Sequence, residues 1–477
     1  MKLFALILLA CLVLIDPVHA QKNALAESID KRSEASWEMA KKIWAWAEPG
    51  YQETKSSALL ADELEKAGFK VERGVAKIPT AFTATFGSGK PVIGILGEYD
   101  ALPEISQSTE PFRQRVEGNA YGHGCGHHLF GVASASAAIA IKEQIESGKI
   151  KGTIRFYGCP AEEGGGAKAF MVREGLFKDC DAVLHWHPGS RNTAGDSSSL
   201  ARMAVKFRFH GTQAHAAGSP EKGRSALDAV QLTCHAAELL REHCPDFTRI
   251  HHVITHGGGG APNVVPEFAE VYFYIRHPKG DIVSKLYPRL LKCAEAGALA
   301  TETKLEVKYE GGIMEILPND PLSQVVKANL MKLNDISYTD EEKKFALRLQ
   351  ESLEEKTPLD VVQKVFSVSG TTGKGSTDVG DVSWLVPTAG FSTACFVPGS
   401  AGHSWQNVAA SGTTIGKKGM HLAAKTLAAS AWDLFQDPKL IDTAKEEHAR
   451  RLDGRKYLSL MGKDQPPPLD YRNPPKR

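Results

Sequence analysis

Val92-Ile-Gly-Ile-Leu96 is a continuous run of apolar residues in a chain of 477 residues. A short run without polar alternation is typical of a strand that is buried on both faces of a sheet. Around it the sequence alternates between further predicted strands (81–86, 153–157 and 182–184) and predicted helices (58–67 and 132–142). This alternation predicts an α/β sheet with helices on its faces.

The pattern changes near Ala201, where strands with polar–apolar alternation begin. The elements that follow have a β-α-β-β-α-β order: strands at 203–209, 251–255, 270–275 and 305–309, and helices at 225–241 and 282–296, the second expected to stop at Gly297. This order is typical of a small ferredoxin-like α+β unit inserted into a larger domain.

The predicted division is a first domain formed by residues 21–200 and 312–440, an inserted domain at 201–311 and a C-terminal tail at 441–477. The proline-rich end of that tail, from Gln465, is incompatible with regular structure. We expect it to drape over the surface or to be disordered.

Residues 1–20 carry the features of a signal peptide. Lys2 precedes a 13-residue apolar run, Leu3–Ile15, which is too short to span a bilayer. Small residues before Gln21 complete a cleavage site. A lipoprotein box ending at Cys11 is the alternative, but apolar residues continue past it. We therefore expect an exported protein, periplasmic or secreted.

The composition is that of a globular protein, with 42% hydrophobic residues, 24% charged residues and a formal net charge of +1. This balance gives no electrostatic basis for binding nucleic acid or a membrane surface, and we expect neither partner. Of the eight cysteines, one lies in the predicted signal peptide and the others are scattered. This is not a dense disulfide framework.

Tyr121-Gly-His-Gly-Cys-Gly-His-His-Leu-Phe-Gly131 packs a cysteine and three histidines among glycines. Cys125 and His127 are two residues apart, so in an extended segment both side chains would leave the same face. Thiolate and imidazole together suit zinc and similar ions. The alternative interpretation is a glycine-rich turn with a half-buried thiol.

Carboxylates and histidines occur in other loops. Glu162 and Glu163 follow a predicted strand, and such a pair can serve two roles, one carboxylate binding metal while the other moves protons. His185 and His187 follow the next strand and are expected to point the same way, and His403 lies in a glycine-bordered loop. Taken singly, the acidic pair would be a solvated loop and each histidine a structural residue.

As a set, these residues recur after successive strands, where open α/β sheets bind ligands. One thiolate, three imidazoles and one carboxylate exceed the ligands of a single open tetrahedral zinc site. Two metal ions would use all of them and leave room for a bridging water. The reaction expected of such a site is hydrolysis of a polarised carbonyl.

The sequence resembles a family of di-metal amidohydrolases and carboxypeptidases that includes carboxypeptidase G and the plant auxin-conjugate hydrolases. The likeness covers roughly residues 33–435 and rests on these motifs, in the family's order: Gly97-Glu-Tyr-Asp-Ala-Leu-Pro103, Gly124-Cys-Gly-His127, Pro160-Ala-Glu-Glu163, His187-Pro188, Gly375-Ser-Thr-Asp-Val-Gly-Asp-Val-Ser-Trp384 and Gly402-His-Ser404. The resemblance implies an α/β, phosphorylase/hydrolase-like catalytic domain with a mixed sheet, and an inserted α+β lid or dimerisation domain. It also implies two divalent metal ions (Zn or Mn) and a homodimer.

The resemblance implies a role for each matching residue. The implied metal ligands are Cys125, His127, Glu163, His187 (preferred to His185 because it alone precedes proline) and His403. Glu162 is implied as the general base that activates the attacking water. In the inserted domain, His215 is implied to stabilise the oxyanion, often across a dimer interface, while Asn263 and Arg276 hold the substrate carbonyl and carboxylate.

Four positions depart from the family pattern or lack a role in it. Asp100 lies in a matching motif that gives it no ligand role, and His128 stands where relatives carry aspartate or asparagine. Asp378 and Asp381 either line the site or cap the following helix.

The predicted function is metal-dependent hydrolysis of the amide bond of N-acyl or N-aroyl amino acids of the aminobenzoyl-glutamate type, which are small-molecule substrates. The alternatives are a non-catalytic or helper subunit of a hetero-oligomeric amidohydrolase, or a dipeptidase or carboxypeptidase of the same family. Outside this family, they are a thiol hydrolase that uses Cys125 and an exported binding protein.

Overall fold

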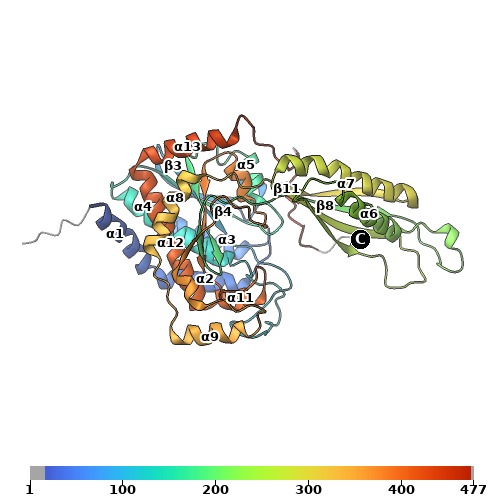
Figure 1. Cartoon of the computed structure of the whole chain (residues 1–477), viewed down its shortest axis with the longest axis horizontal. Coiled ribbons are helices and arrows are strands. Elements are labelled where there is room, and N and C mark those ends of the chain that lie inside the picture. Colours follow the sequence, from blue (N-terminus) through green and yellow to red (C-terminus); the bar gives the residue numbers. More distant parts are fainter. Residues whose placement is uncertain (1–16, 463, 474–477) are drawn as a thin grey trace, which may run out of the picture.

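The computed structural model describes residues 17–462 and 464–473. It consists of a body, which carries the α/β sheet, and an inserted unit, which projects from one side of the body (Figure 1). One large hydrophobic cluster fills the body and another fills the inserted unit. The apolar run of the predicted signal peptide, Leu3–Ile15, lies outside the described residues, so export stays a prediction.

The body sheet has the strand order β1-β2-β4-β3-β5-β13. β3 (Val92–Glu98) is buried at every residue and pairs in parallel with β4 (Gly152–Cys159) and β5 (Ala182–Leu184). β2 (Phe82–Ser88) runs antiparallel to β4, so the sheet is mixed, as predicted. The edge strands are β1 (Lys70–Arg73) and β13 (Thr388–Ala389).

Helix α4 (His127–Glu146) packs against β3 and is buried along most of its length. The approach is close at Gly131, where a Cβ atom would lie 2.8 Å from the carbonyl oxygen of Glu98. Only glycine permits this distance. The first turn of α4, which carries His127, therefore lies beside the C-terminal end of β3.

The other helices of the body are α1 (Pro17–Lys31), α2 (Ser33–Trp46), α3 (Thr54–Lys66), α5 (Ala167–Arg173), α8 (Asp320–Leu333), α9 (Asp340–Gln350), α10 (Val379–Ser383), α11 (Trp405–Ser411), α12 (Thr414–Gln436) and α13 (Pro438–Leu452). A smaller sheet has the order β12-β7-β14-β6, with β12 at Val365–Ser367, β7 at Asn192–Ala194, β14 at Phe391–Ala394 and β6 at His187–Gly189. Helix α13 extends into the predicted tail, which is therefore partly helical.

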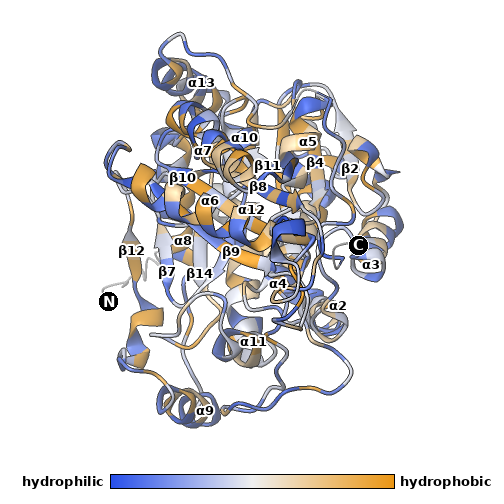
Figure 2. Cartoon of the chain, turned by 90° about the vertical axis from the view of Figure 1, so that its right-hand side faces the viewer, coloured by the Kyte–Doolittle hydropathy of each residue, from blue (hydrophilic) through white to orange (hydrophobic). Residues whose placement is uncertain are grey.

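The inserted unit is an antiparallel sheet of order β11-β8-β10-β9, and Figure 2 shows α6 and α7 lying over its strands. The elements are β8 (Ala201–His210), α6 (Ala226–Arg241), β9 (Arg249–His256), β10 (Phe268–His277), α7 (Gly280–Thr301) and β11 (Lys304–Ile313). Their order along the chain confirms the predicted β-α-β-β-α-β pattern. Use of this unit as a lid or a dimerisation domain stays a prediction.

The predicted stop of a helix at Gly297 is wrong, because α7 continues to Thr301. Gly297 lies where α7 crosses α6, and a Cβ atom there would come within 2.6 Å of Thr233 Oγ1. The glycine therefore permits close helix packing and does not end the helix.

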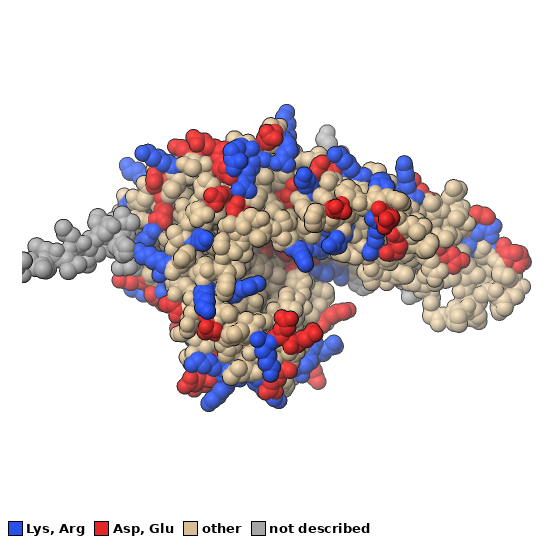
Figure 3. All heavy atoms as spheres, in the orientation of Figure 1, with Lys and Arg blue, Asp and Glu red and all other residues tan. Residues whose placement is uncertain are grey.

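Lysine and arginine side chains alternate with acidic ones over the face shown in Figure 3, in keeping with the net charge of +1. No helix among residues 17–462 and 464–473 is long and apolar enough to cross a membrane. All seven cysteines of this part of the chain are free thiols.

Candidate metal centre

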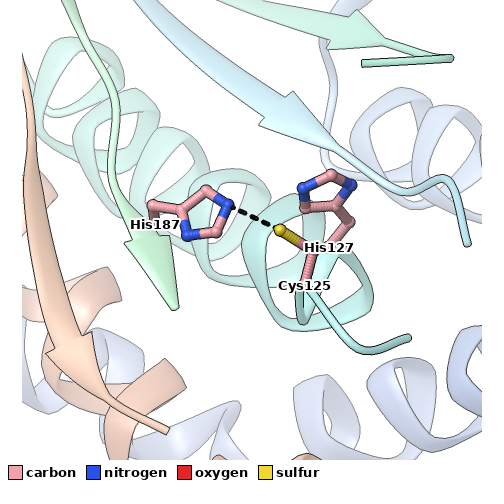
Figure 4. Close-up of side chains that lie close together, drawn as sticks. All are labelled: Cys125, His127 and His187. Atoms are coloured by element: carbon pink, nitrogen blue, oxygen red, sulfur yellow. Dashed lines mark hydrogen bonds between the residues drawn. The ribbon is translucent and has the colours of Figure 1, made fainter. Parts of the chain in front are cut away.

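Three side chains from two segments of the body, the start of α4 and the start of β6, converge on one point (Figure 4). Cys125 lies in the loop that enters α4, His127 is the first residue of α4, and His187 is the first residue of β6. Cys125 Sγ lies 3.3 Å from His187 Nε2, and the ligand atoms of the three residues lie within 4.8 Å of one another. A thiolate and two imidazoles at this spacing suit zinc and similar ions.

The loop reaches this geometry by a turn. Gly126 has a left-handed backbone with φ 77°, and a Cβ atom there would lie 2.8 Å from the side chain of Pro188. Both the backbone and the lack of space require glycine. The prediction that Cys125 and His127 project from one face of an extended segment is therefore wrong, although both side chains reach the same cluster.

Two further groups adjoin the first, each with ligand atoms within 4.8 Å of one another. One is Cys125, Glu163 and His403, in which His403 Nε2 lies 3.2 Å from Glu163 Oε1. The other is Glu98, His127 and Glu162. The residues predicted as ligands thus form two groups that share Cys125, whereas Glu98, the last residue of β3, was not predicted.

A cavity of about 630 Å³ opens over these groups. Six of the predicted site residues line it: Cys125, Glu162, Glu163, His187, His403 and Arg276. His127 lies beneath its surface and is fully buried. His403 is the most open of the ligand candidates, with 55% of its side chain exposed.

The remaining histidines near the motifs have structural surroundings. The His185 ring lies against Gly390, where a Cβ atom would come within 2.2 Å of His185 Nε2, and among the described residues His185 joins none of the three candidate ligand groups. His123 and His128 are buried, and their rings lie 3.1 and 3.3 Å from the carbonyl oxygens of Ile43 and Ser411. These three residues therefore belong to the packing around the site.

Asp100 orients His127. Its Oδ1 lies 2.8 Å from His127 Nδ1, and its Oδ2 accepts a hydrogen bond of 2.9 Å from the backbone N–H of Glu163. Burial would raise the pKa of Asp100, but the charge and hydrogen bond of His127 hold it at about 2. An ionised Asp100 at Nδ1 leaves Nε2 of His127 directed toward the cluster, as is usual for metal-binding histidines.

Replacing Asp100 by asparagine is expected to lower metal affinity or activity by about 10- to 100-fold, because the charge that orients His127 is lost. Zinc titration of the metal-free protein, with steady-state turnover on the same samples, measures the effect. Asp381→Asn is the matched control, since Asp381 is a buried aspartate that does not line the cavity. Equal metal affinity in Asp100→Asn and wild-type protein would contradict the orienting role.

Behind the cluster lies a buried charge triad. Lys168 Nζ lies 2.7 Å from Glu98 Oε1 and 2.7 Å from Asp378 Oδ1, and all three side chains are at most 2% exposed. Burial would lower the pKa of Lys168, but the charges of Asp378 and Glu98 raise it well above its ordinary value. Asp378 thus neither lines the cavity nor caps α10 through its side chain. No motif in the sequence marks Lys168, so its role was not predicted.

The acid–base balance of the cluster favours a cation. Burial would raise the pKa of Cys125, but His187 and His127 lower it well below the usual value, which favours the thiolate. Hydrogen bonds to Cys125 and Glu163 raise the pKa of His403 to about 11. The thiolate and the carboxylates lie close together, and their negative charges favour protonated histidines. Divalent metal ions would balance these negative charges in place of the protons.

Two atoms of the cluster, Glu98 Oε2 and His127 Nε2, are buried without a hydrogen-bond partner among the described residues. Glu98 Oε2 and His127 Nε2 lie only 3.1 Å apart, yet without the geometry of a hydrogen bond. Buried polar atoms that lack partners are rare in folded proteins. Together with the donor types, this fits a site for divalent metal ions.

Glu162 has the surroundings of a proton carrier. Burial raises its pKa well above the ordinary value, and the neighbouring charges of Glu98 and Glu163 raise it further. It lines the cavity beside the ligand candidate Glu163. A carboxylate with a raised pKa suits general acid–base chemistry near neutral pH.

The inserted unit contributes to the cavity through one end of its sheet. Arg202 and Arg276 are cross-strand partners at the ends of β8 and β10 that meet the body, and both line the cavity with Tyr272 and Tyr274. The guanidinium carbons of Arg202 and Arg276 lie 4.7 and 5.5 Å from the Tyr274 ring centre. Arg276 is therefore placed to contact a ligand.

His215 and Asn263 lie at the opposite end of the same sheet. His215 follows β8, Asn263 precedes β10, and the two loops join through a hydrogen bond of 2.9 Å from Ala216 N–H to the carbonyl oxygen of Asn263. A ten-residue strand such as β8 is about 30 Å long. A single chain thus brings Arg276 to the cavity, but not His215 or Asn263.

The chain matches the description "Peptidase family M20/M25/M40" over residues 94–463. The chain belongs to this peptidase family. It is 40% identical over 468 residues to a p-aminobenzoyl-glutamate hydrolase subunit of Escherichia coli (strain K12), and the alignment covers 92% of this chain and 97% of that protein. It is 28% identical to the Xaa-Arg dipeptidase of Mus musculus, with 92% and 94% covered. Family membership and the hydrolase relative identify an enzyme that hydrolyses amide bonds.

Two solved structures share the fold. An aminobenzoyl-glutamate utilization protein from Klebsiella pneumoniae superposes with a TM-score of 0.62 at 17% identity, covering 86% of this chain and 99% of that one. A dinuclear metal binding peptidase of the M20 family from Bacillus subtilis gives a TM-score of 0.56 at 17% identity, covering 85% and 99%. These likenesses confirm the α/β body with an inserted α+β unit.

Proposed function

We propose that the protein is a metal-dependent hydrolase of N-acyl or N-aroyl amino acids. The observation that supports this most is the convergence of Cys125, His127, Glu163, His187 and His403 around one cavity. Two divalent ions, Zn or Mn, would be held by these side chains, with Cys125 between the two groups. Such ions polarise a substrate carbonyl and lower the pKa of water.

Glu162 supplies the proton chemistry in this proposal. As a carboxylate it takes a proton from the water that attacks the amide carbonyl carbon. When the carbon–nitrogen bond breaks, Glu162 returns the proton to the leaving amine nitrogen. Its raised pKa allows it to hold the proton between the two events.

Arg276 binds the free carboxylate of the substrate, because its planar fork matches a carboxylate. We assign oxyanion stabilisation to His215 of the partner subunit, and contact with the substrate carbonyl to Asn263 of the partner subunit. This assignment requires a homodimer in which each inserted unit reaches the other cavity. The distance of about 30 Å between the two ends of the sheet favours this arrangement over one chain acting alone.

The acyl group is proposed as aromatic, of the aminobenzoyl-glutamate type, on the strength of the Escherichia coli relative's name. Tyr272 and Tyr274 in the cavity wall supply aromatic surface for such a ring. A dipeptidase is the second candidate, because the mouse relative is named as one.

Removing the metal tests the proposal. We expect dialysis against a chelator to abolish hydrolysis of a benzoyl-amino acid, and Zn or Mn to restore it, because the carboxylates and imidazoles alone cannot polarise the carbonyl. Metal analysis and turnover of a panel of acyl-amino acids and dipeptides, run on the same samples, measure the effect.

Two of the alternatives predict different outcomes. A thiol hydrolase using Cys125 would keep its activity after chelation and lose it to iodoacetamide. A helper subunit would bind metal and hydrolyse no member of the panel by itself.

A further inference from the structure

The C-terminal segment Asp464–Asn473 reaches the cavity although it has no helix or strand. Its start is fixed to the body and to the inserted unit: Arg173 Nη1 donates to the carbonyl oxygen of Gln465 at 2.7 Å, and Gln465 Nε2 donates to that of Tyr309 at 2.9 Å. The prediction of a tail without regular structure is confirmed for this segment. The segment lies over the surface, which is one of the two predicted possibilities: residues 464, 466, 469, 470 and 473 are exposed, whereas Tyr471 and Arg472 are half-buried.

Tyr471 anchors the end of the segment beside the ligand candidates. Its hydroxyl donates to the carbonyl oxygen of Glu163 at 3.0 Å, and its ring meets Tyr51 edge-on with centres 5.7 Å apart. A Cβ atom on Gly50 would lie 2.2 Å from the Tyr471 hydroxyl. The absence of a side chain at Gly50 therefore leaves the space that the Tyr471 hydroxyl occupies.

Arg472 follows and lines the cavity. One of its terminal nitrogens, Nη2, donates to the same Glu163 carbonyl oxygen, and its guanidinium lies 4.7 Å from the Tyr471 ring centre. Its Nε is buried without a hydrogen-bond partner among the described residues. The tyrosine therefore holds the guanidinium in place while part of its donor fork stays free.

Arg472, Arg202 and Arg276 form a set of three cavity arginines. None of the three has a salt bridge within residues 17–462 and 464–473, and Arg276 Nε is also buried without a partner. Burial lowers the pKa of Arg276, and the charge of Arg202 lowers it further. The charges of Glu162 and Glu163 offset this lowering of the pKa only in part. Other partly buried arginines of the described chain are paired, such as Arg208 with Glu270. Unpaired, partly buried guanidinium groups are unfavourable unless a ligand supplies the anion.

We propose that Arg472 binds a second carboxylate of the substrate, and that the C-terminal segment thereby sets a preference for dicarboxylic substrates. The inference rests on the proposed function, in which Arg276 takes the first carboxylate. Arg276 comes from the inserted unit and Arg472 from the body beside Glu163, so the two guanidinium groups approach a ligand from different elements. Residues 464–473 follow the family-matched part of the chain, so the family motifs do not assign this role.

The second carboxylate has two possible sources, the amine half of the substrate or its acyl half. We assign it to the amine half, because the aromatic wall of Tyr272 and Tyr274 favours an apolar acyl group. Three substrates separate the cases: benzoyl-glycine with one carboxylate, benzoyl-glutamate with two on the amine half, and succinyl-glycine with the second on the acyl half.

The test compares kcat and KM for wild-type protein, Arg472→Gln and Arg472→Lys. We expect wild-type protein to prefer benzoyl-glutamate, and Arg472→Gln to lose about 10- to 100-fold in kcat/KM for that substrate, mainly through KM, since a charge-assisted hydrogen bond is removed. Benzoyl-glycine should change less than about threefold, so that the preference collapses, and Arg472→Lys should restore part of it.

Two further variants separate binding from structural effects. Tyr471→Phe removes the hydroxyl that contacts Glu163, so a loosened segment would lower turnover of all substrates equally. Arg450→Gln changes an exposed arginine that pairs with Glu447 and should leave every constant unchanged. Equal losses on benzoyl-glycine and benzoyl-glutamate in Arg472→Gln would overturn the proposal, and a loss confined to succinyl-glycine would overturn its assignment to the amine half.

Calorimetric binding of glutamate and glycine to the same variants gives a readout that does not depend on turnover. A wild-type protein that hydrolyses none of the three substrates would refute the proposed function. Glutamate binding that weakens in Arg472→Gln would still support the carboxylate site. Identical glutamate binding in wild-type protein and Arg472→Gln would refute that site alone.

Discussion

Glu162→Gln is expected to lower kcat by about 10²- to 10⁴-fold while the bound metal stays at its wild-type level. Glutamine keeps the shape of the side chain but cannot accept the proton of the attacking water. Burial and the charges of Glu98 and Glu163 raise the pKa of Glu162, so the carboxyl group is adapted to exchange protons. Steady-state kinetics and metal analysis on the same preparation measure both quantities.

Glu163→Gln is the matched comparison, because Glu163 is the adjacent carboxylate and lies with Cys125 and His403. Its loss should reduce metal content as well as turnover. The pair of variants therefore separates proton transfer from ligation. A Glu162→Gln variant that turns over substrate at the wild-type rate would remove Glu162 from the mechanism.

Lys168→Met is expected to reduce the free energy of unfolding by about 3–5 kcal/mol, because it removes the cation from a buried charge cluster. Methionine has similar length, so the change deletes charge with little change in volume. Glu98 and Asp378 would then remain as two buried carboxylates without their shared partner. Urea unfolding of the metal-free protein measures the loss.

Lys343→Met provides the control on an exposed ion pair, since Lys343 and Asp340 are 54% and 83% exposed. A surface pair of this kind contributes at most about 1 kcal/mol. The double variant Lys168→Met with Asp378→Asn should be more stable than Lys168→Met alone. The second substitution removes one of the two buried carboxylate charges that Lys168→Met leaves without a cation. Unfolding midpoints that are the same for Lys168→Met and Lys343→Met would show that the triad does not stabilise the body.

The body sheet was predictable because its strands carry a local signal. The apolar run in β3 indicates burial at its own residues. The glycines of the loop before α4 indicate a tight turn at theirs. The ligand candidates were found for the same reason, since they cluster in short motifs beside strand ends. The grouping around Cys125 was not predictable from spacing, because distances between residues as remote as 125 and 403 are set by the sheet order.

The missed residues share the property that their role depends on what surrounds them. Lys168 sits in a helix among small residues, and only the fold shows that Glu98 and Asp378 meet it. Gly297 carries the usual signature of a helix end, yet its lack of a side chain serves contact with Thr233. Arg472 lies in a proline-rich stretch whose composition predicts irregular backbone and says nothing of where that backbone runs.

The position of Tyr471 and Arg472 has a consequence for how the enzyme is made. The ribosome releases the ligand candidates, up to His403, well before the last wall of the cavity emerges. Domains fold largely as units while the chain is synthesised, N-terminal parts first. The candidate ligand residues can therefore come together on a nascent chain whose cavity still lacks Tyr471 and Arg472, and the proposed selectivity for dicarboxylic substrates would arise only when these two residues dock.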